Sequence, residues 1–372
     1  MFMTDLRLKR YLLLVVLVVS LSAVFHGLWL LDLIPWSIGY SDVMAFWNRA
    51  SAPGFPYIDK LMEYPVLTGV FVQLAGVLGT QPGYYIFSVI FLILASAAAT
   101  YFLYQINPAN RNRILSFWIF APSLILFSTH NWDIFAVLFS ILAFYFFNKG
   151  NKNLAAVFLA LGFSAKFFPV IYLAPLLLKE ENWKNRWKIL GVFLAAVLLV
   201  NGYFMIANFD GWSQFFRINS ERNSNMESIW TVARYLIPPL SVKGINILSF
   251  LFFAGSYLAV LWKLRSASLL TLSAVGTLLF LIFNKIFSAQ YLIWLLPFLV
   301  LLPFRANKFW FYSMEFSNWI VVFMSLQWWF AARDNFYFFA SMPFIFLRHL
   351  GLLIILFTII KWAKLSDRSR KY

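Results

Sequence analysis

The stretch YPVLTGVFVQLAGVLGT, residues 64–80, decides how the remainder of the chain is threaded. It is apolar enough to cross a bilayer, but a crossing here would place the later basic segments outside the cell. Short loops rich in Lys and Arg stay cytoplasmic. We therefore predict that residues 64–80 form a re-entrant or interfacial helix, because every basic segment then falls inside. These segments contain Arg7, Lys9, Arg10, Arg111, Arg113, Lys149, Lys152, Lys179, Lys184, Arg186, Lys188, Lys263, Arg265, Arg305 and Lys308.

Apolar runs fill most of the chain around this stretch. Hydrophobic residues make up 62% of the 372 positions and charged residues only 12%, which excludes an ordinary soluble domain. Since a membrane-spanning helix needs about 20 apolar residues, we predict an all-α polytopic membrane protein with about 10–12 transmembrane helices and both termini cytoplasmic. Residues 1–372 form a single membrane domain in this interpretation. The candidate spans are 11–31, 83–104, 114–128, 133–148, 153–165, 167–179, 189–207, 244–263, 268–284, 290–303, 309–330 and 341–362.

Several chemistries are excluded or disfavoured by composition. The chain has no cysteine, which rules out disulfides, thiolate catalysis and cysteine metal sites. Its three histidines lie far apart and form no paired-ligand motif, so we expect neither a metal nor another cofactor. The net charge of +16 is spread over loops on one predicted side, where topology explains it better than nucleic-acid binding does.

Three of the carboxylates in the predicted external segments are candidate site residues. Asp42 follows the first span in a long external segment, whose aromatic residues suit an interfacial amphipathic helix. Either Ser41 or Asp42 also suits the N-cap of a helix over residues 43–50. Glu63 suits a helix entry just before Pro65, and Asp133 suits either an N-cap or a functional position. Each of these residues is open to a structural and a functional interpretation.

Cations in the same external segments work against the charge rule. Lys166 interrupts a long apolar stretch, and Lys285 lies in a tight turn between two spans. A lysine in such a place needs a carboxylate or a phosphate as its partner. Arg217 and Arg222 add further external cations. Together with the carboxylates, these residues predict a site that holds a phosphate beside a carboxylate base.

Five short polar motifs follow one another along the chain. They are Tyr40-Ser41-Asp42, Glu63-Tyr64-Pro65, Asn131-Trp132-Asp133, Lys166-Phe167-Phe168-Pro169 and Lys285-Ile286-Phe287-Ser288-Ala289-Gln290-Tyr291. In this order they resemble the GT-C membrane glycosyltransferases, and more narrowly glycosyltransferase family 87, which includes polyprenyl-phosphate-mannose-dependent mannosyltransferases. The resemblance covers residues 10–300, with Ala289 and Val66 standing where the family usually has proline. Residues 304–372 match no family motif and are expected to form variable C-terminal helices.

The resemblance implies an inverting glycosyltransferase that moves a sugar, with mannose favoured, from a polyprenyl-phosphate donor to a lipid or glycan acceptor. It implies that Asp42 is the catalytic base and that the reaction takes place on the outer face of the cell membrane. We assign the donor phosphate to Lys166 and Lys285, with Arg217 or Arg222 closing over it. Sugar or acceptor positioning is assigned to Tyr40, Glu63, Tyr64, His130, Asn131, Asp133, Gln290 and Tyr291.

Two other functions compete with this interpretation. A transporter or flippase for a lipid-linked or anionic solute would use similar cations, but alternating access predicts charges at mid-membrane and internal repeats. The charges here lie at the ends of the spans, and no repeat is evident. A structural or assembly protein would have no need for five ordered polar motifs.

Overall fold

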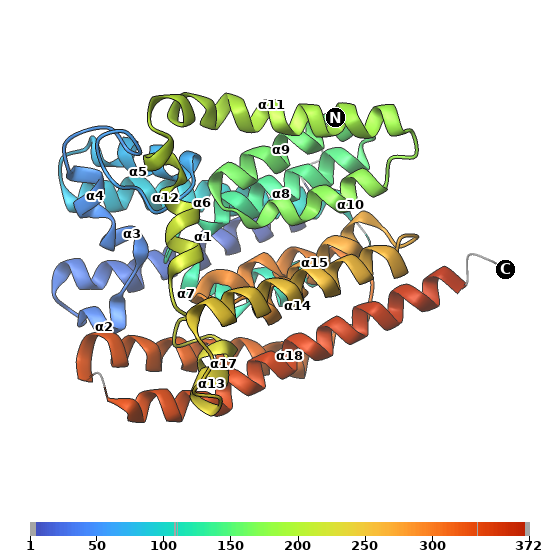
Figure 1. Cartoon of the computed structure of the whole chain (residues 1–372). Coiled ribbons are helices and arrows are strands. Elements are labelled where there is room, and N and C mark those ends of the chain that lie inside the picture. Colours follow the sequence, from blue (N-terminus) through green and yellow to red (C-terminus); the bar gives the residue numbers. More distant parts are fainter. Residues whose placement is uncertain (1–4, 108, 110, 333, 369–372) are drawn as a thin grey trace.

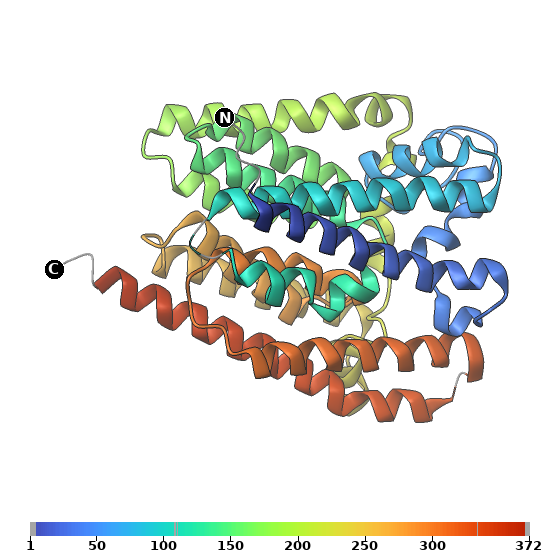
Figure 2. The ribbon, with the colours of Figure 1, turned by 180° about the vertical axis from the view of Figure 1, so that it is seen from behind.

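The computed structural model describes residues 5–107, 109, 111–332 and 334–368, and over these ranges the chain consists of helices and loops. The helices lie side by side as an elongated bundle (Figure 1 and Figure 2). Five helices in the described ranges are long and apolar enough to cross a membrane, and six shorter apolar segments of 10–17 residues accompany them. These features confirm the predicted all-α polytopic membrane fold. The long helices are Leu6–Leu31, Gln81–Ile106, Trp183–Ala207, Val242–Lys263 and Asn335–Ser366.

Successive passes through the bundle alternate in direction (Figure 1). One end carries α2 (Trp36–Gly39), α3 (Asp42–Ala45), α4 (Trp47–Ser51), α5 (Val66–Gly76), α12 (Phe209–Glu221) and α13 (Ile229–Leu236), and we call it the site end. The helices that run toward it are α1 (Leu6–Gly27), η3 (Leu115–Ile119) with α7 (Pro122–Phe127), α9 (Lys152–Ala165), α11 (Trp183–Ala207), α15 (Leu269–Phe283) and α17 (Lys308–Gln327). The helices that run away from it are α6 (Gln81–Ile106), α8 (Asp133–Asn148), η4 (Phe168–Tyr172) with α10 (Leu173–Leu178), α14 (Val242–Lys263), η5 (Ala289–Trp294) with α16 (Leu296–Leu301), and α18 (Asn335–Arg368).

The basic segments gather at the opposite end, which we call the basic end. Direct contacts join them there: Lys152 Nζ lies 2.8 Å from a Glu180 carboxylate oxygen, and Lys179 Nζ donates to the Arg265 carbonyl at 2.6 Å. The start of α1 and the end of α18 lie at this end as well (Figure 2). The charge pattern therefore predicted the relative placement of these segments. That the basic end faces the cytoplasm remains a prediction from the same charge rule.

Helix α5 shows why residues 64–80 are decisive. Its 11 residues span only about 16 Å at 1.5 Å per residue, against a hydrocarbon core of about 30 Å. Thr68, near its start, donates to the Ala165 carbonyl at 2.7 Å, and Gly76, at its end, lies against the Ala50 carbonyl. Since both contacts are at the site end, α5 returns without crossing. This is the re-entrant arrangement that the charge rule predicts.

Short polar side chains set where several long helices begin. Thr80, Ser241 and Ser268 precede α6, α14 and α15, and each side-chain oxygen accepts a hydrogen bond from a backbone N–H three residues later. Such caps satisfy one of the N–H groups that a helix start leaves unpaired. Serine and threonine at these positions therefore separate the apolar helices from the preceding loops.

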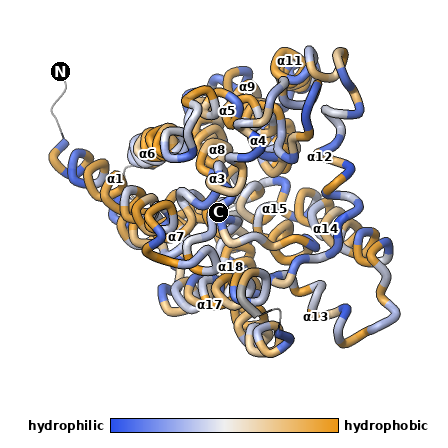
Figure 3. Tube along the Cα trace, turned by 90° about the vertical axis from the view of Figure 1, so that its left-hand side faces the viewer, coloured by the Kyte–Doolittle hydropathy of each residue, from blue (hydrophilic) through white to orange (hydrophobic). Residues whose placement is uncertain are grey.

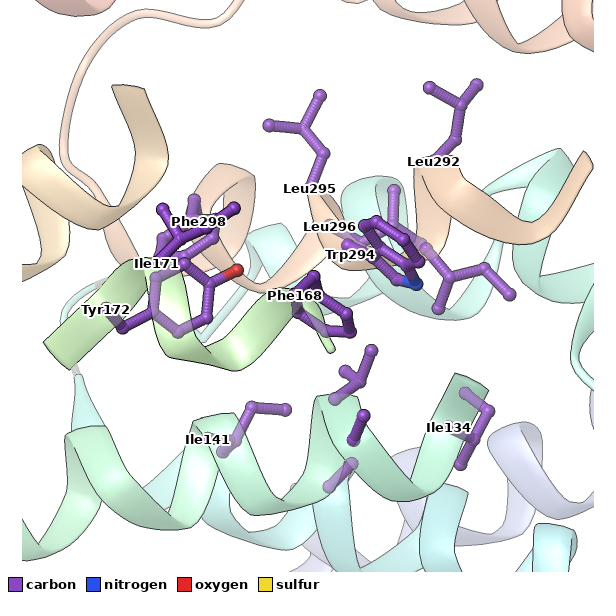
Figure 4. Close-up of a cluster of buried hydrophobic side chains, with 14 of the residues drawn as sticks. Ile134, Ile141, Phe168, Ile171, Tyr172, Leu292, Trp294, Leu295, Leu296 and Phe298 are labelled. Atoms are coloured by element: carbon purple, nitrogen blue, oxygen red, sulfur yellow. The ribbon is translucent and has the colours of Figure 1, made fainter. Parts of the chain in front are cut away.

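An aromatic and aliphatic core holds the short helices beneath the site end (Figure 4). The ring of Phe168 from η4 stacks on Trp294 from η5 with centroids 4.1 Å apart, and α8 contributes Ile134 and Ile141. Burial on several sides allows these helices to be shorter than a lipid-exposed span. Figure 3, which looks onto the site end, shows hydrophilic stretches near α3, α4 and α12 among largely hydrophobic helices.

Candidate active site

A cavity of about 540 Å³ opens at the site end, and it gathers most of the predicted site residues. Its wall is formed by α3, the segments that follow α7 and α9, α12, the turn between α15 and η5, and the end of α17. Only Arg217 and Asp133 of the predicted set are absent from the lining. The predicted residues that line the cavity are Tyr40, Asp42, Glu63, Tyr64, His130, Asn131, Lys166, Arg222, Lys285, Gln290 and Tyr291.

Asp42 is held by three side chains from separate segments. Its carboxylate accepts hydrogen bonds from the Tyr40 hydroxyl at 2.6 Å, the Tyr64 hydroxyl at 3.1 Å and the Asn131 amide at 2.5 Å. The charge of Asp42 is the main cause that raises the pKa of Tyr40 far above its usual range, and burial raises it further. Both effects keep Tyr40 protonated, so it remains a hydrogen-bond donor to the carboxylate.

The structural alternative for this segment was a helix cap, and the geometry differs from it. Ser41 occupies the N-cap position of α3 but makes no capping hydrogen bond. Its hydroxyl donates instead to the carbonyls of Thr129 and His130, both at 3.2 Å. Asp42 lies inside the first turn and uses its carboxylate for the three side-chain donors. The segment is therefore anchored to the loop before α8 rather than capped.

His130 and Glu63 flank this carboxylate. His130 Nδ1 lies 3.1 Å from the Tyr40 carbonyl, and burial lowers the pKa of the imidazole, which favours the neutral ring. Glu63 forms an ion pair with Arg49, a residue that the sequence interpretation did not single out. In place of Glu63, Pro65 occupies the N-cap position of α5. Glu63 thus anchors α4 to the segment before α5 while its side chain lines the cavity.

Asp133 and Lys166 form a buried pair beside the cavity. The Lys166 ammonium lies 3.1 Å from the Asp133 carboxylate, whose second oxygen accepts a hydrogen bond from Trp294 Nε1 at 2.7 Å. Asp133 is only 1% exposed, whereas Lys166 reaches the cavity wall and lies 4.8 Å from the centre of the Tyr64 ring. Lys166 was expected to need a carboxylate or a phosphate partner, and Asp133 is the carboxylate. It begins α8 without capping it.

Lys285 and Arg222 supply positive charge elsewhere on the wall. The Lys285 ammonium donates to the carbonyls of Ser220 at 3.0 Å and Arg222 at 2.8 Å. Burial, assisted by the nearby charge of Arg222, lowers the pKa of Lys285 to about 8. Arg217 lies on an exposed part of α12, outside the cavity, and donates to the Asp210 carbonyl at 3.3 Å. These two cations of the cavity wall therefore come from the turn after α15 and the end of α12.

Sequence reasoning missed several residues of this region. Glu227, Ser325 and Trp294 line the cavity, and the fully buried Arg348 donates a hydrogen bond to the Glu227 carbonyl. Arg348 interrupts an apolar run just as Lys166 does, so the rule that singled out Lys166 also applies to it. No family motif drew attention to it, because it lies after residue 304. Glu227 follows the predicted external cations Arg217 and Arg222 in the sequence, but its spacing carried no signal of its own.

The cavity combines a carboxylate held by fixed donors with two cations, Lys285 and Arg222, that lie outside the described ion pairs, and this combination suits a particular kind of chemistry. The carboxylate can accept a proton from a bound hydroxyl, and the cations can stabilise an anionic group at the same time. Within the described ranges, no three His, Asp or Glu side chains converge on a possible metal position.

Comparison with known proteins gives a consistent assignment. The model of glycosyltransferase family 87 matches residues 63–284, more than half of the chain. "GPI mannosyltransferase 1" from Saccharomyces cerevisiae is 26% identical over 246 residues, which are 59% of this chain and 60% of that protein. The protein of the same name from Kluyveromyces lactis is 27% identical over 214 residues, 51% of this chain and 52% of that protein. The chain thus spans less than two thirds of the length of these relatives.

Proposed function

The chain belongs to glycosyltransferase family 87, and from that premise we propose that it is a membrane mannosyltransferase with a polyprenyl-phosphate donor. The acceptor is a hydroxyl group of a lipid or glycan, and the reaction takes place in the cavity at the site end. The names of the curated relatives support mannose as the sugar. The charge rule supports the outer face of the membrane as the location.

The observation that carries this proposal is the setting of Asp42. Its carboxylate lies on the cavity wall and is oriented by Tyr40, Tyr64 and Asn131. Transfer requires a base that takes the proton of the acceptor hydroxyl as its oxygen bonds to the anomeric carbon. The bond from that carbon to the donor phosphate breaks in the same reaction, and the polyprenyl phosphate leaves with the electron pair. A single base without a covalent intermediate gives inversion at the anomeric carbon.

Lys285 and Arg222 are the proposed partners of the departing phosphate. Both line the cavity, and the described ion pairs engage neither of their side chains. Lys166 already forms an ion pair with Asp133 and packs against the Tyr64 ring, so its charge is less available to a phosphate. Arg217 would have to move into the cavity before it could contact a phosphate. These differences rank Lys285 and Arg222 above Lys166 and Arg217.

The position of the cavity favours transfer over transport. An alternating-access carrier is expected to bind its solute near the bilayer midplane, between repeats that rock around the site. Here the candidate groups lie at one end of the bundle, on loops and helix termini. A reaction with lipid-linked substrates at one membrane face matches this placement.

Replacing Asp42 by Asn tests the proposal. Asn keeps the size of the side chain and a carbonyl oxygen, but it cannot take a proton at neutral pH. We expect mannose transfer from polyprenyl-phosphate mannose to fall about 100- to 10,000-fold, with donor binding retained. Asp32→Asn is the matched control, because Asp32 is exposed, lies in the same segment and has a positive φ of 56° that Asn tolerates. Near-normal turnover of Asp42→Asn would refute the assignment of the base.

A further inference from the structure

One wall of the cavity carries a buried side-chain oxygen atom that has no hydrogen-bond partner among the described residues. Gln290 is 2% exposed and Ser325 is 1% exposed, and both side chains line the cavity. Within the described residues, the Gln290 side-chain oxygen has no hydrogen-bond partner, and the Ser325 hydroxyl has only the neighbouring Glu227 carboxylate beside it. Buried polar atoms are nearly always paired, since an unpaired one costs about 1–3 kcal/mol. Because the Gln290 side chain lines the cavity, a bound molecule is the natural source of the missing donor.

Glu227 adds a carboxylate to the same wall. It lines the cavity, and no described Lys or Arg side chain forms an ion pair with it. Its carboxylate accepts a hydrogen bond from the Asn225 amide, which leaves further acceptor positions open. Burial raises the pKa of Glu227, and the nearby Ser325 hydroxyl offsets part of that rise. The wall therefore presents two acceptors that the described donors do not fully satisfy, the Glu227 carboxylate and the Gln290 side-chain oxygen.

A buried frame fixes the backbone that carries this wall. The Arg348 guanidinium donates to the Asn318 side-chain oxygen at 2.9 Å and to the Glu227 carbonyl. It also lies 3.7 Å from the centre of the Phe287 ring. Asn318 in turn donates to the Ala289 carbonyl at 2.9 Å, directly before Gln290. A fully buried arginine is costly, and here it ties α17 and α18 to the two segments that present Glu227 and Gln290.

Ligand chemistry follows from this excess of acceptors. A phosphate offers only acceptor oxygens and would be repelled by the Glu227 carboxylate, whereas the hydroxyl groups of a sugar ring donate. We propose that Glu227, Gln290 and Ser325 form a hydroxyl-binding subsite that holds a polyhydroxylated ring. The inference deepens the proposed function and rests on it. The ring belongs either to the donor mannose or to the acceptor, and the two sources share the same chemistry.

Binding of a simple sugar tests the subsite without turnover. The probes are methyl α-D-mannopyranoside and its tetra-O-methyl derivative, which keeps the ring but has no hydroxyl donor. Saturation-transfer NMR on the whole protein in detergent should detect binding of the free sugar, with the derivative at least tenfold weaker. Glu227→Gln should weaken binding of the free sugar about tenfold or more, and Ser325→Ala should weaken it about two- to tenfold. The matched control is Ser317→Ala, since Ser317 is a buried residue of α17 that bonds the Ser313 carbonyl and does not line the cavity.

Equal binding of both probes would overturn the subsite. So would Glu227→Gln and Ser325→Ala variants that bind the free sugar as well as Ser317→Ala does. If Glu227→Gln lowers the thermal unfolding temperature, Ser325→Ala and the O-methylated probe still decide the result. The KM for polyprenyl-phosphate mannose then identifies the source of the ring. A raised donor KM in both wall variants assigns it to the donor, and an unchanged donor KM with weakened sugar binding assigns it to the acceptor.

The two proposals fail in different ways. If the Glu227 and Ser325 variants bind the sugar more weakly but the protein transfers no mannose, the proposed function is refuted and the subsite stands. If mannose transfer depends on Asp42 but the Glu227 and Ser325 variants bind the sugar normally, the subsite is refuted and the proposed function stands.

Discussion

Raising the pH from 7 to 9 should weaken donor binding through the loss of one charge, that of Lys285. Burial and the charge of Arg222 lower the pKa of this residue from 10.5 to about 8. The cation is therefore present below about pH 8 and lost above it, from about 90% protonated at pH 7 to about 10% at pH 9. The phosphate of a polyprenyl-phosphate sugar keeps its single negative charge over this range, so the change belongs to the protein.

The size of the effect follows from the contact that is lost. A hydrogen bond between an ammonium and a phosphate contributes about 1.5–3 kcal/mol, which corresponds to roughly tenfold to hundredfold in affinity. Since about a tenth of the protein keeps the charge at pH 9, the donor dissociation constant should rise up to about tenfold between pH 7 and 9. Bound phosphate favours the charged lysine, so the alkaline limb of kcat should lie at higher pH than that of kcat/KM.

Donor binding and steady-state rates over this pH range measure the prediction. Lys285→Met should bind donor about tenfold or more weakly at pH 7 and show no alkaline limb near pH 8. Lys285→Arg should keep binding at pH 9, because a guanidinium is not deprotonated there. Lys243→Met, an exposed lysine at the start of α14 on the same end, is the matched control. A flat donor affinity from pH 7 to 9, or a limb that persists in Lys285→Met, would refute the reasoning.

Three further predictions test the pair, the re-entrant helix and the topology. Lys166→Met leaves the buried Asp133 without its cation, so the free energy of unfolding should fall by about 3 kcal/mol. Adding Asp133→Asn should restore the lost stability. An unchanged unfolding temperature in Lys166→Met would contradict a stabilising pair. Gly69→Ala places a Cβ against the Tyr57 hydroxyl and should lower the free energy of unfolding by about 1–3 kcal/mol, whereas Gly255→Ala, with open space around it, should not. Equal stability of the two variants would count against the packing of α5. In this cysteine-free chain, an impermeant thiol reagent should label Asp210→Cys in intact cells and Lys184→Cys only after permeabilisation. Labelling of Lys184→Cys but not of Asp210→Cys in intact cells would show the opposite topology.

The helices were largely predictable because apolar length and charge act locally along the chain. The predicted spans 133–148 and 153–165 correspond to α8 (Asp133–Asn148) and α9 (Lys152–Ala165). The resemblance drawn from the five motifs is confirmed by the family match over residues 63–284. Asp42 and Lys285 lie outside that match, so their roles depend on the geometry and the proposed experiments.

Partnerships between side chains were less predictable than helices. The requirement that Lys166 have an anionic partner followed from its apolar surroundings, but Asp133 lies 33 residues away and either of two other carboxylates suited the role as well. The pairing of Glu63 with Arg49 and the anchoring of Ser41 to Thr129 and His130 depend on how short loop helices fold against one another. Periodicity carries no information on such contacts. Arg348 was recognisable as a buried charge, but its contacts with Asn318 and the Glu227 carbonyl needed three-dimensional packing.

The brevity of α5 sets a limit on how relatives of this chain can diverge in length. Each later helix takes its direction from the fact that Val66–Gly76 turns back. Roughly nine extra apolar residues would extend this helix to the about 20 needed for a crossing, and every subsequent pass would then reverse. Asp42 would stay on one side of the bilayer while Asp133, Lys166 and Lys285 moved to the other. Insertions within α5 should therefore be selected against, so that the positions of insertions and deletions among relatives record this constraint.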